Sequence, residues 1–391
     1  MRRRQRPGKQ ARAPSLGANA HLIGKARSRE RLATPALVLD LDALDGNLKA
    51  MAAYCRTHKR TLRPHAKTHK SARIAALQAK HGASGICVAT MREAQVMVAA
   101  GVRGVLVTSP MAGEAKLDAA AALLQRDRGV MFVIDSLAGA RAWESRLRKA
   151  RLTAKVLIDI DVGMKRTGVS DIRSALTLAR HLDASDRLEL LGVQCYSGMV
   201  QHIDKYVNRA IIYREELVLL ETLLNKFRSR GLPTKIVSGG GTGTFDIDRE
   251  QGLFTECQAG SYVFMDVQYN EVEILRRRPV PFATALFVQS MVLSNNHPGS
   301  ATLDAGFKSF AMDGPLPLVH SGAPDGAKFL FYGDEFGKLS WRSKSKRMPL
   351  GKKVEFVTPH CDPTVNLHNV YHCVRGDRLV DIWPVDARGS V

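Results

Sequence analysis

Arg63-Pro-His-Ala-Lys67-Thr-His-Lys70 follows a short strand-like run and precedes a helix-like segment at residues 71–79. If the chain folds as a parallel α/β barrel, a lysine at the carboxyl end of a strand stands at the face where the active sites of that fold gather. The alternative interpretation is a solvated basic turn, because Arg and Lys are dense in this segment. Spacing alone favours the basic turn, so the rest of the chain has to decide between the two.

Apolar, β-branched runs recur from Thr34 onward, and each is followed by a segment with a helical, amphipathic pattern. The runs occupy residues 60–64, 85–89, 104–108, 130–134, 155–160, 191–195, 234–237 and 256–259. Continuous apolar strands that alternate with helices indicate a parallel sheet covered on both faces. Eight such units predict a (β/α)8 barrel, with a doubly wound sheet as the alternative.

The pattern changes after Val280, where strand-like pieces dominate and Gly, Pro and Asp turns separate them. This pattern of short strands separated by turns is typical of an antiparallel β-domain. We therefore expect a barrel over residues 32–279 followed by a C-terminal antiparallel β-domain over residues 280–391. The run at residues 35–40 fits a strand of either domain.

The net charge of +21 is unevenly distributed along the 391 residues. Residues 1–31 hold ten Arg or Lys residues and a single acid, Glu30, without hydrophobic periodicity. We expect a basic disordered arm that lacks the apolar region of a signal peptide. A transit peptide is an alternative. No nucleic-acid-binding signature accompanies the charge, and no apolar stretch is long enough to predict a membrane span, so we expect neither partner.

Six cysteines form no CxxC pair and no regular framework, and several lie inside apolar runs, such as Cys87. This usage predicts buried free thiols in a reducing cytoplasm.

Polar residues follow the predicted barrel strands and converge at one end. They are Lys67, Arg166, Tyr196 with His202 shortly after it, the run Ser238-Gly-Gly-Gly-Thr-Gly243, and Gly260-Ser261. Glycine-rich loops after the seventh and eighth strands are a common phosphate site in barrels, although a glycine run alone indicates only a tight turn. Lysine forms Schiff bases with carbonyl compounds and with pyridoxal phosphate (PLP). Together, these residues predict a lysine that faces a phosphate site across the barrel mouth.

A second group lies in the predicted β-domain, in Pro359-His360-Cys361-Asp362-Pro363. In an extended segment His360 and Asp362 would point to the same side and Cys361 to the other. Imidazole and carboxylate together suit a divalent metal, whereas the Cys/His spacing of a structural zinc site is absent. The alternative is a hydrogen-bonded turn.

The chain resembles fold-type III PLP enzymes of the D-threonine aldolase and D-serine dehydratase group, which are relatives of alanine racemase. The resemblance rests on motifs spread over residues 34–388. They are Thr34-Pro-Ala-Leu-Val-Leu-Asp40, Arg63–Lys70, Asp161-Val-Gly-x-x-Arg-x-Gly-Val169, Ser238–Gly243, Gln258-Ala-Gly-Ser-Tyr-Val-Phe-Met-Asp266, Leu303-Asp-Ala-Gly-Phe-Lys-Ser309 and His360-Cys-Asp-Pro-Thr-Val-Asn-Leu-His368.

The resemblance implies a role for each matching residue. Lys67 would bind PLP covalently, Arg166 would lie near its phenolic oxygen and Tyr196 would contact its ring. Thr242, Gly260 and Ser261 would hold the phosphate, and His202 matches an aldolase position for a base. His360 and Asp362 would hold the metal, for which the carboxylate favours Mn²⁺ or Mg²⁺, with Zn²⁺ as the alternative. The resemblance also implies a head-to-tail homodimer.

Two positions and one stretch depart from the aldolase pattern. Ser197 stands where D-threonine aldolases often have His, and Phe336 where the group usually has His. The stretch from Cys87 to Glu93 looks more like the dehydratases.

The resemblance implies cleavage of D-3-hydroxy amino acids to glycine and an aldehyde, and we expect a cytoplasmic enzyme. The alternative is a dehydratase of D-serine or D-threo-3-hydroxyaspartate that yields a 2-oxo acid and ammonia. A non-catalytic PLP-binding barrel protein is more remote, because such proteins lack a β-domain.

Overall fold

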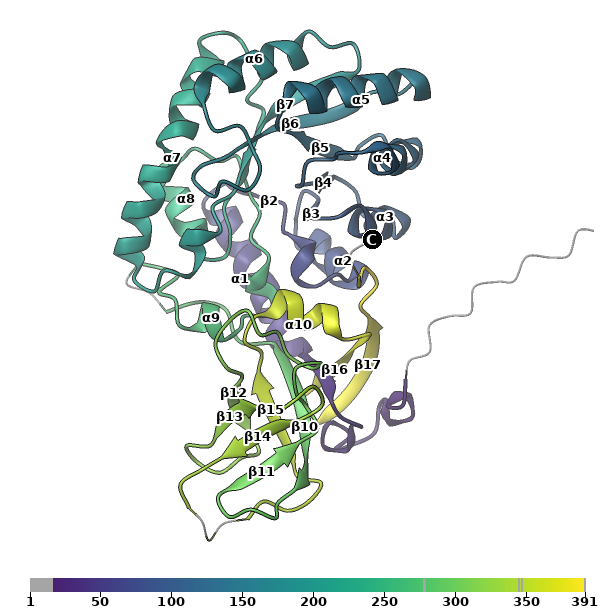
Figure 1. Cartoon of the computed structure of the whole chain (residues 1–391), viewed down its shortest axis with the longest axis vertical. Coiled ribbons are helices and arrows are strands. Elements are labelled where there is room, and N and C mark those ends of the chain that lie inside the picture. The colour runs from purple at the N-terminus through teal and green to yellow at the C-terminus, as the bar shows by residue number, and fades with distance from the viewer. Residues whose placement is uncertain (1–16, 277–278, 344, 346, 390–391) are drawn as a thin grey trace, which may run out of the picture.

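The computed structural model describes residues 17–276, 279–343, 345 and 347–389. A parallel barrel-like body carries helices on its outside, and a second body of strands lies beneath its open end (Figure 1). Residues 1–16, half of the expected disordered arm, lie outside the described part of the chain.

The barrel sheet contains eight parallel strands in the order β2-β9-β8-β7-β6-β5-β4-β3. An isolated parallel bridge between His65 and Cys87 joins the segment after β2 to β3, so the sheet curls back on itself. The predicted barrel architecture is confirmed, and each strand falls on one of the eight apolar runs. The strands are β2 (Thr61–Leu62), β3 (Ile86–Val88), β4 (Val105–Val107), β5 (Met131–Ile134), β6 (Ala154–Ile160), β7 (Leu188–Cys195), β8 (Ile236–Gly239) and β9 (Glu256–Cys257).

Helices alternate with these strands and cover the outside of the sheet (Figure 1). Several begin at a residue whose side chain accepts a hydrogen bond from the first turn, as Thr90, Ser136 and Asp171 do, which satisfies an otherwise unpaired backbone N–H. The helices are α1 (Leu41–Thr57), α2 (Ala72–Lys80), α3 (Met91–Ala99), α4 (Glu114–Arg126), α5 (Leu137–Ala150), α6 (Ile172–Asp183), α7 (Tyr206–Arg228) and α8 (Phe245–Gln251). The short helix α9 (Val267–Asn270) leads out of the barrel.

The second body is a nine-stranded, mostly antiparallel sheet with the path β13-β14-β11-β10-β1-β16-β17, to which β15 adds beside β10 and β12 beside β15. β1 joins this sheet and pairs in parallel with β16, so the run at residues 35–40 belongs to the β-domain and the sheet is not purely antiparallel. The strands are β1 (Ala36–Asp40), β10 (Leu286–Ser294), β11 (Ser300–Leu303), β12 (Leu318–Ser321), β13 (Lys328–Phe331), β14 (Gly337–Ser340), β15 (Lys353–Val357), β16 (Val370–Arg375) and β17 (Arg378–Pro384).

Residues 17–31 differ from the expected disordered arm because they pack on the β-domain. They contain two 3-10 turns, η1 (Ala20–Leu22) and η2 (Arg29–Arg31), and Leu22 is buried. The Arg29 guanidinium makes a bidentate pair with Glu355 of β15, at 2.7 and 2.8 Å. Tertiary contacts therefore order a segment that has no hydrophobic periodicity of its own.

Two large apolar clusters support the two bodies, one between barrel sheet and helices and one centred on the β-domain with α1 packed into it. A small cluster fills the barrel interior below the mouth, around Leu106, Val133 and Leu157. All six cysteines are buried and unpaired, as expected. Within the described ranges, none of the helices has the length and apolar character needed to cross a membrane.

Candidate active site

A cavity of about 390 Å³ lies at the carboxyl ends of the barrel strands and is bordered on one side by α10 (Cys361–Leu367) of the β-domain. All nine residues predicted for the site line it, although they come from six separate segments of the chain. They are Lys67, Arg166, Tyr196, His202, Thr242, Gly260, Ser261, His360 and Asp362. A wider, more open hollow of about 810 Å³ adjoins it through Arg166 and Thr167, but Lys67 is not among the residues that line this hollow. The structure brings the nine residues together, and their individual roles remain predictions.

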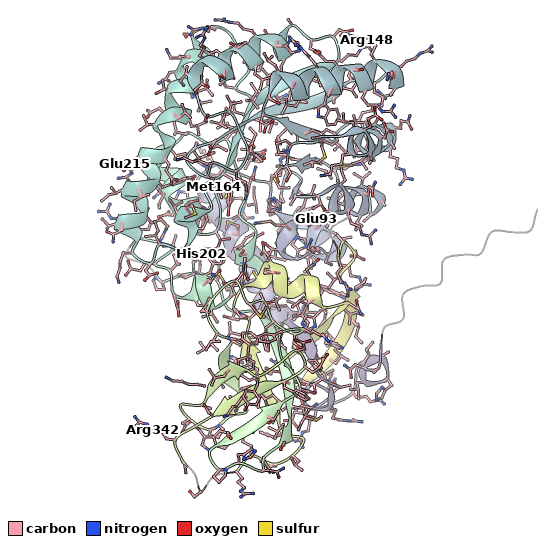
Figure 2. The ribbon with its side chains drawn as sticks, in the orientation of Figure 1. Glu93, Arg148, Met164, His202, Glu215 and Arg342 are labelled. Atoms are coloured by element: carbon pink, nitrogen blue, oxygen red, sulfur yellow. The ribbon has the colours of Figure 1, made fainter. Side chains whose placement is uncertain are left out.

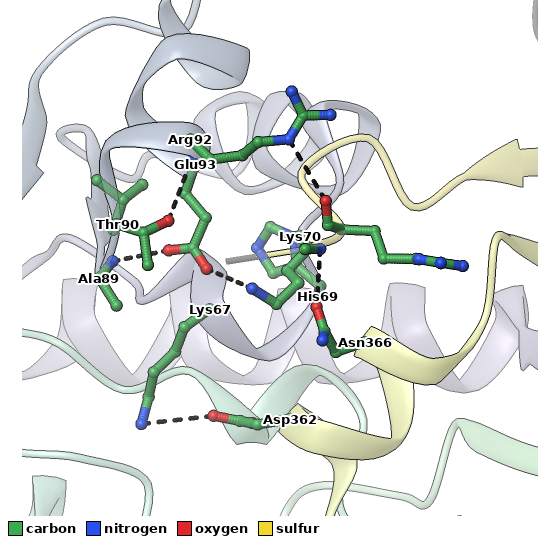
Figure 3. Close-up of polar contacts among 12 residues, drawn as sticks. Lys67, His69, Lys70, Ala89, Thr90, Arg92, Glu93, Asp362 and Asn366 are labelled. Atoms are coloured by element: carbon green, nitrogen blue, oxygen red, sulfur yellow. Dashed lines mark hydrogen bonds and ion pairs between the residues drawn. The ribbon is translucent and has the colours of Figure 1, made fainter. Parts of the chain in front are cut away.

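The two lysines of the opening segment have different surroundings. Lys67 lies in the short turn η3 (Ala66–Thr68), and its Nζ is 3.4 Å from Asp362 Oδ2 (Figure 3). Lys70 instead makes a buried 2.6 Å ion pair with Glu93 of α3. The Asp362 carboxylate raises the pKa of Lys67 above its ordinary value. Only Lys67 is placed to react with a molecule in the cavity.

His65 is a lining residue that the sequence did not single out. Its Nδ1 accepts a hydrogen bond from the backbone N–H of Lys67 (3.3 Å), and its Nε2 lies 3.1 Å from Thr108 Oγ1. The Thr108 hydroxyl donates to the carbonyl of Val88 (3.1 Å), so its oxygen accepts from His65 Nε2–H. Burial lowers the pKa of His65 well below its ordinary range. A neutral imidazole therefore supports the turn that carries Lys67.

The loops after β8 and β9 form a backbone nest beside Lys67. Gly240 has φ +73°, and a Cβ on it would lie 2.1 Å from Asp248 Oδ2. A Cβ on Gly260 would lie 2.7 Å from Thr68 Oγ1 and 2.9 Å from the carbonyl oxygen of His65. Both positions therefore require glycine. The hydroxyls of Thr242 and Ser261 lie at the same backbone nest. Together, the backbone amides and these hydroxyls fit a phosphate.

The ring of Tyr196 lies close to two cations of the cavity. The Arg166 guanidinium and Lys67 Nζ are each 5.8 Å from the centroid of its ring. Both groups are within the range of cation–π attraction, which fixes the ring beside the lysine.

His202 ends the turn η4 (Met199–His202), at the level where the barrel meets the β-domain (Figure 2). Its ring packs on Tyr269, with centroids 4.6 Å apart. Within the described residues its buried Nδ1 atom has no hydrogen-bond partner. Burial, reinforced by His360, lowers the pKa of His202 to about 4. The imidazole is therefore neutral at pH 7 and has a lone pair available to accept a proton.

His360 and Asp362 both line the cavity, but the segment that carries them has a different conformation from the one expected. The segment is not extended: His360 is the N-cap of α10, and Asp362 lies in its first turn. Asp266 Oδ2 accepts the N–H of Cys361 at 2.9 Å and holds this turn in place. Burial alone would raise the pKa of Asp362, but Lys67 and His360 outweigh it and lower the pKa to about 2.

These two side chains fit a divalent cation that keeps several other ligands. His360 Nδ1 lies 2.8 Å from Asp313 Oδ2, so the other ring nitrogen is left for a ligand role. Over the residues that the structure describes, no set of three or more His, Cys, Asp and Glu side chains is placed to hold a metal. An imidazole and a carboxylate fit a divalent cation when water or substrate supplies its remaining ligands.

Two glutamines of the cavity floor were missed by the sequence reasoning. Gln194 of β7 donates to Asp159 Oδ1 at 3.0 Å, and Gln258 donates to Gln194 Oε1 at 3.2 Å. A polar residue near the carboxyl end of an apolar strand was the available signal. Ser197 is buried and Phe336 is exposed on the β-domain, and neither is among the residues lining the cavity.

The mouth of the parallel barrel holds a lysine beside an anion nest, and a β-domain closes this mouth. These features define the class of fold-type III PLP enzymes. The family description "Alanine racemase, N-terminal domain" matches residues 39–268, and "Putative serine dehydratase domain" matches residues 285–374. The chain belongs to the group of these lyases formed by D-threonine aldolases and D-serine dehydratases.

Relatives of both reaction types are similar over most of the chain. A D-threonine aldolase of Arthrobacter sp is 36% identical, covering 92% of this chain and 93% of its own. A 3-hydroxy-D-aspartate aldolase of Paracoccus denitrificans (strain Pd 1222) is 32% identical, covering 91% of this chain and 92% of its own. A D-threo-3-hydroxyaspartate dehydratase of Delftia sp. (strain HT23) is 29% identical, covering 90% of this chain and 97% of its own. The crystal structure of D-threonine aldolase from Filomicrobium marinum, at 36% identity, superposes with a TM-score of 0.87 over 93% of this chain and 97% of that one.

Proposed function

We propose that the chain cleaves D-3-hydroxy amino acids, such as D-threonine, to glycine and an aldehyde, with PLP and a divalent metal as cofactors. One observation carries the proposal: a neutral histidine, His202, lines the same cavity as Lys67 and the His360–Asp362 pair. A retro-aldol cleavage needs a base for the β-hydroxyl, and His202 meets that need. The named aldolase relatives agree with this assignment.

The roles of the residues follow from their positions. When bound, PLP supplies an electron sink for the Cα–Cβ bond that breaks, and a divalent cation lowers the pKa of the substrate hydroxyl. Lys67 would hold PLP covalently, while Thr242, Gly260 and Ser261 would hold its phosphate. His202 would accept the hydroxyl proton, and Tyr269 keeps the imidazole in place by packing on its ring.

Dehydration is the alternative reaction, and the Delftia relative favours it. There Lys67 would remove the α-proton and hydroxide would leave from Cβ. The metal-binding pair argues for the aldolase, because Asp362 is a hard oxygen ligand where a soft thiolate would suit zinc. The neighbouring thiol of Cys361 is fully buried and is not among the residues lining the cavity.

The products distinguish the two reactions. We expect the purified protein, supplied with PLP and Mn²⁺, to release glycine and an aldehyde from D-threonine and to leave L-threonine unchanged. D-Serine and 3-hydroxy-D-aspartate are tested in parallel, with Zn²⁺ as a second metal. Equal amounts of ammonia and a 2-oxo acid, without glycine from any of the three D-substrates, would overturn the proposal in favour of the dehydratase.

We further propose that the chain works as a homodimer. Large apolar side chains are exposed on both bodies, including Val207, Ile211 and Val218 on α7, and Leu330 and Tyr332 around β13. Such groups commonly mark interfaces, and a two-fold pairing can cover one body of each chain with the other body of its partner. Light scattering should give twice the mass of one chain, and a mass of one chain at micromolar concentration would contradict the pairing.

A further inference from the structure

The second ring nitrogen of His360 has its own partner. Its Nδ1 lies 2.8 Å from Asp313 Oδ2, while the ring, with only 23% of its side chain exposed, lines the cavity. A carboxylate at neutral pH can only accept a hydrogen bond, so Nδ1 carries the proton. The Nε2 atom is then left with its lone pair. The hydrogen-bond partner thus selects the tautomer that a metal ligand needs.

The segment that carries Asp313 is tied to α10 at more than one point. The N–H of Ala311 donates to Thr364 Oγ1 at 3.0 Å, and the Thr364 hydroxyl donates to the carbonyl of His360 at 2.7 Å. At the other end of α10, His368 Nε2 lies 3.0 Å from the carbonyl oxygen of Ser309. Because Thr364 is fully buried, these bonds hold the segment before Asp313 against the helix that begins at His360.

We propose that Asp313 is a positioning residue for the divalent metal: it holds His360 in the orientation and tautomer in which Nε2 can bind the ion. The proposal rests on the metal site of the proposed function. A carboxylate behind a ligating histidine makes the imidazole a stronger donor, and its loss commonly weakens metal affinity by about 10- to 100-fold.

A plain surface ion pair is the competing explanation, since 56% of the Asp313 side chain is exposed. Exposed pairs contribute little to stability, and a pair that does not orient the His360 ring would leave metal binding unchanged. The two explanations therefore differ in metal affinity, which a structural role alone would leave unchanged.

The test uses the PLP-loaded enzyme, freed of metal with a chelator. Mn²⁺ is titrated in, and free Mn²⁺ is followed by electron paramagnetic resonance to give Kd. We expect Asp313→Ala to weaken Mn²⁺ binding by about 10- to 100-fold, and Asp313→Asn to have a smaller effect because the amide oxygen still accepts the Nδ1 proton. Asp325→Ala, an exposed aspartate in the same domain, is the matched control and should leave Kd unchanged.

The visible PLP spectrum and the melting temperature, measured on the same samples, exclude general unfolding. An unchanged Kd for Asp313→Ala, while His360→Ala loses Mn²⁺ binding, overturns the role of Asp313 and leaves the metal site standing. If His360→Ala and Asp362→Ala both bind Mn²⁺ like the unaltered enzyme, the metal site itself is wrong and the role of Asp313 falls with it.

Discussion

Replacing Lys67 with alanine is expected to remove visible PLP absorption and to reduce turnover below about one hundredth, because the cofactor loses its covalent attachment and the site loses a proton-transfer group. Lys67 lines the cavity, whereas Lys70 is held by Glu93. Borohydride treatment of the unaltered enzyme, followed by peptide mapping, should place the reduced cofactor on Lys67.

Lys67→Arg is the matched variant, since it keeps a positive charge opposite Asp362 but cannot form the linkage. It should be as inactive as Lys67→Ala. The comparison separates covalent binding from charge balance, because Asp362 depends on Lys67 to stay ionised in a buried place. Recovery of the cofactor on Lys70, or full activity of either Lys67 variant, would contradict the assignment.

Replacing His202 with alanine should slow glycine formation from D-threonine by roughly 10²-fold or more, the usual loss when a general base is removed. PLP should stay bound, because Lys67 and the glycine loops are the groups proposed to hold it and His202 is not among them. The measurement is the rate of glycine release together with the visible spectrum. His297→Ala, which alters an exposed histidine of the β-domain, should leave both unchanged.

The same variant also separates the two reactions. In a dehydratase Lys67 removes the α-proton, and no base is needed to take the hydroxyl proton. A His202→Ala enzyme that keeps its full rate would therefore remove the main support for cleavage. A variant that loses PLP would assign His202 to cofactor binding instead.

Local sequence patterns were enough to predict most of the barrel. Each of the eight predicted runs became a strand. Most of them are continuously apolar, as burial on both faces of a parallel sheet demands, whereas β2 (Thr61–Leu62) and β9 (Glu256–Cys257) are two-residue strands in runs that contain charged side chains. The same chain order placed Lys67, Arg166 and the glycine loops at the carboxyl ends of strands.

Sequence alone determined the barrel, the β-domain and the nine residues that share one cavity. Tertiary structure alone decided that residues 17–31 fold against the β-domain, that His360 caps a helix and that Asp313 stands behind it. It also decided the protonation of His202 and Asp362. Strand and helix patterns arise from neighbouring residues, whereas burial, ion pairing and pKa depend on partners far away in the chain, which only the folded arrangement brings together.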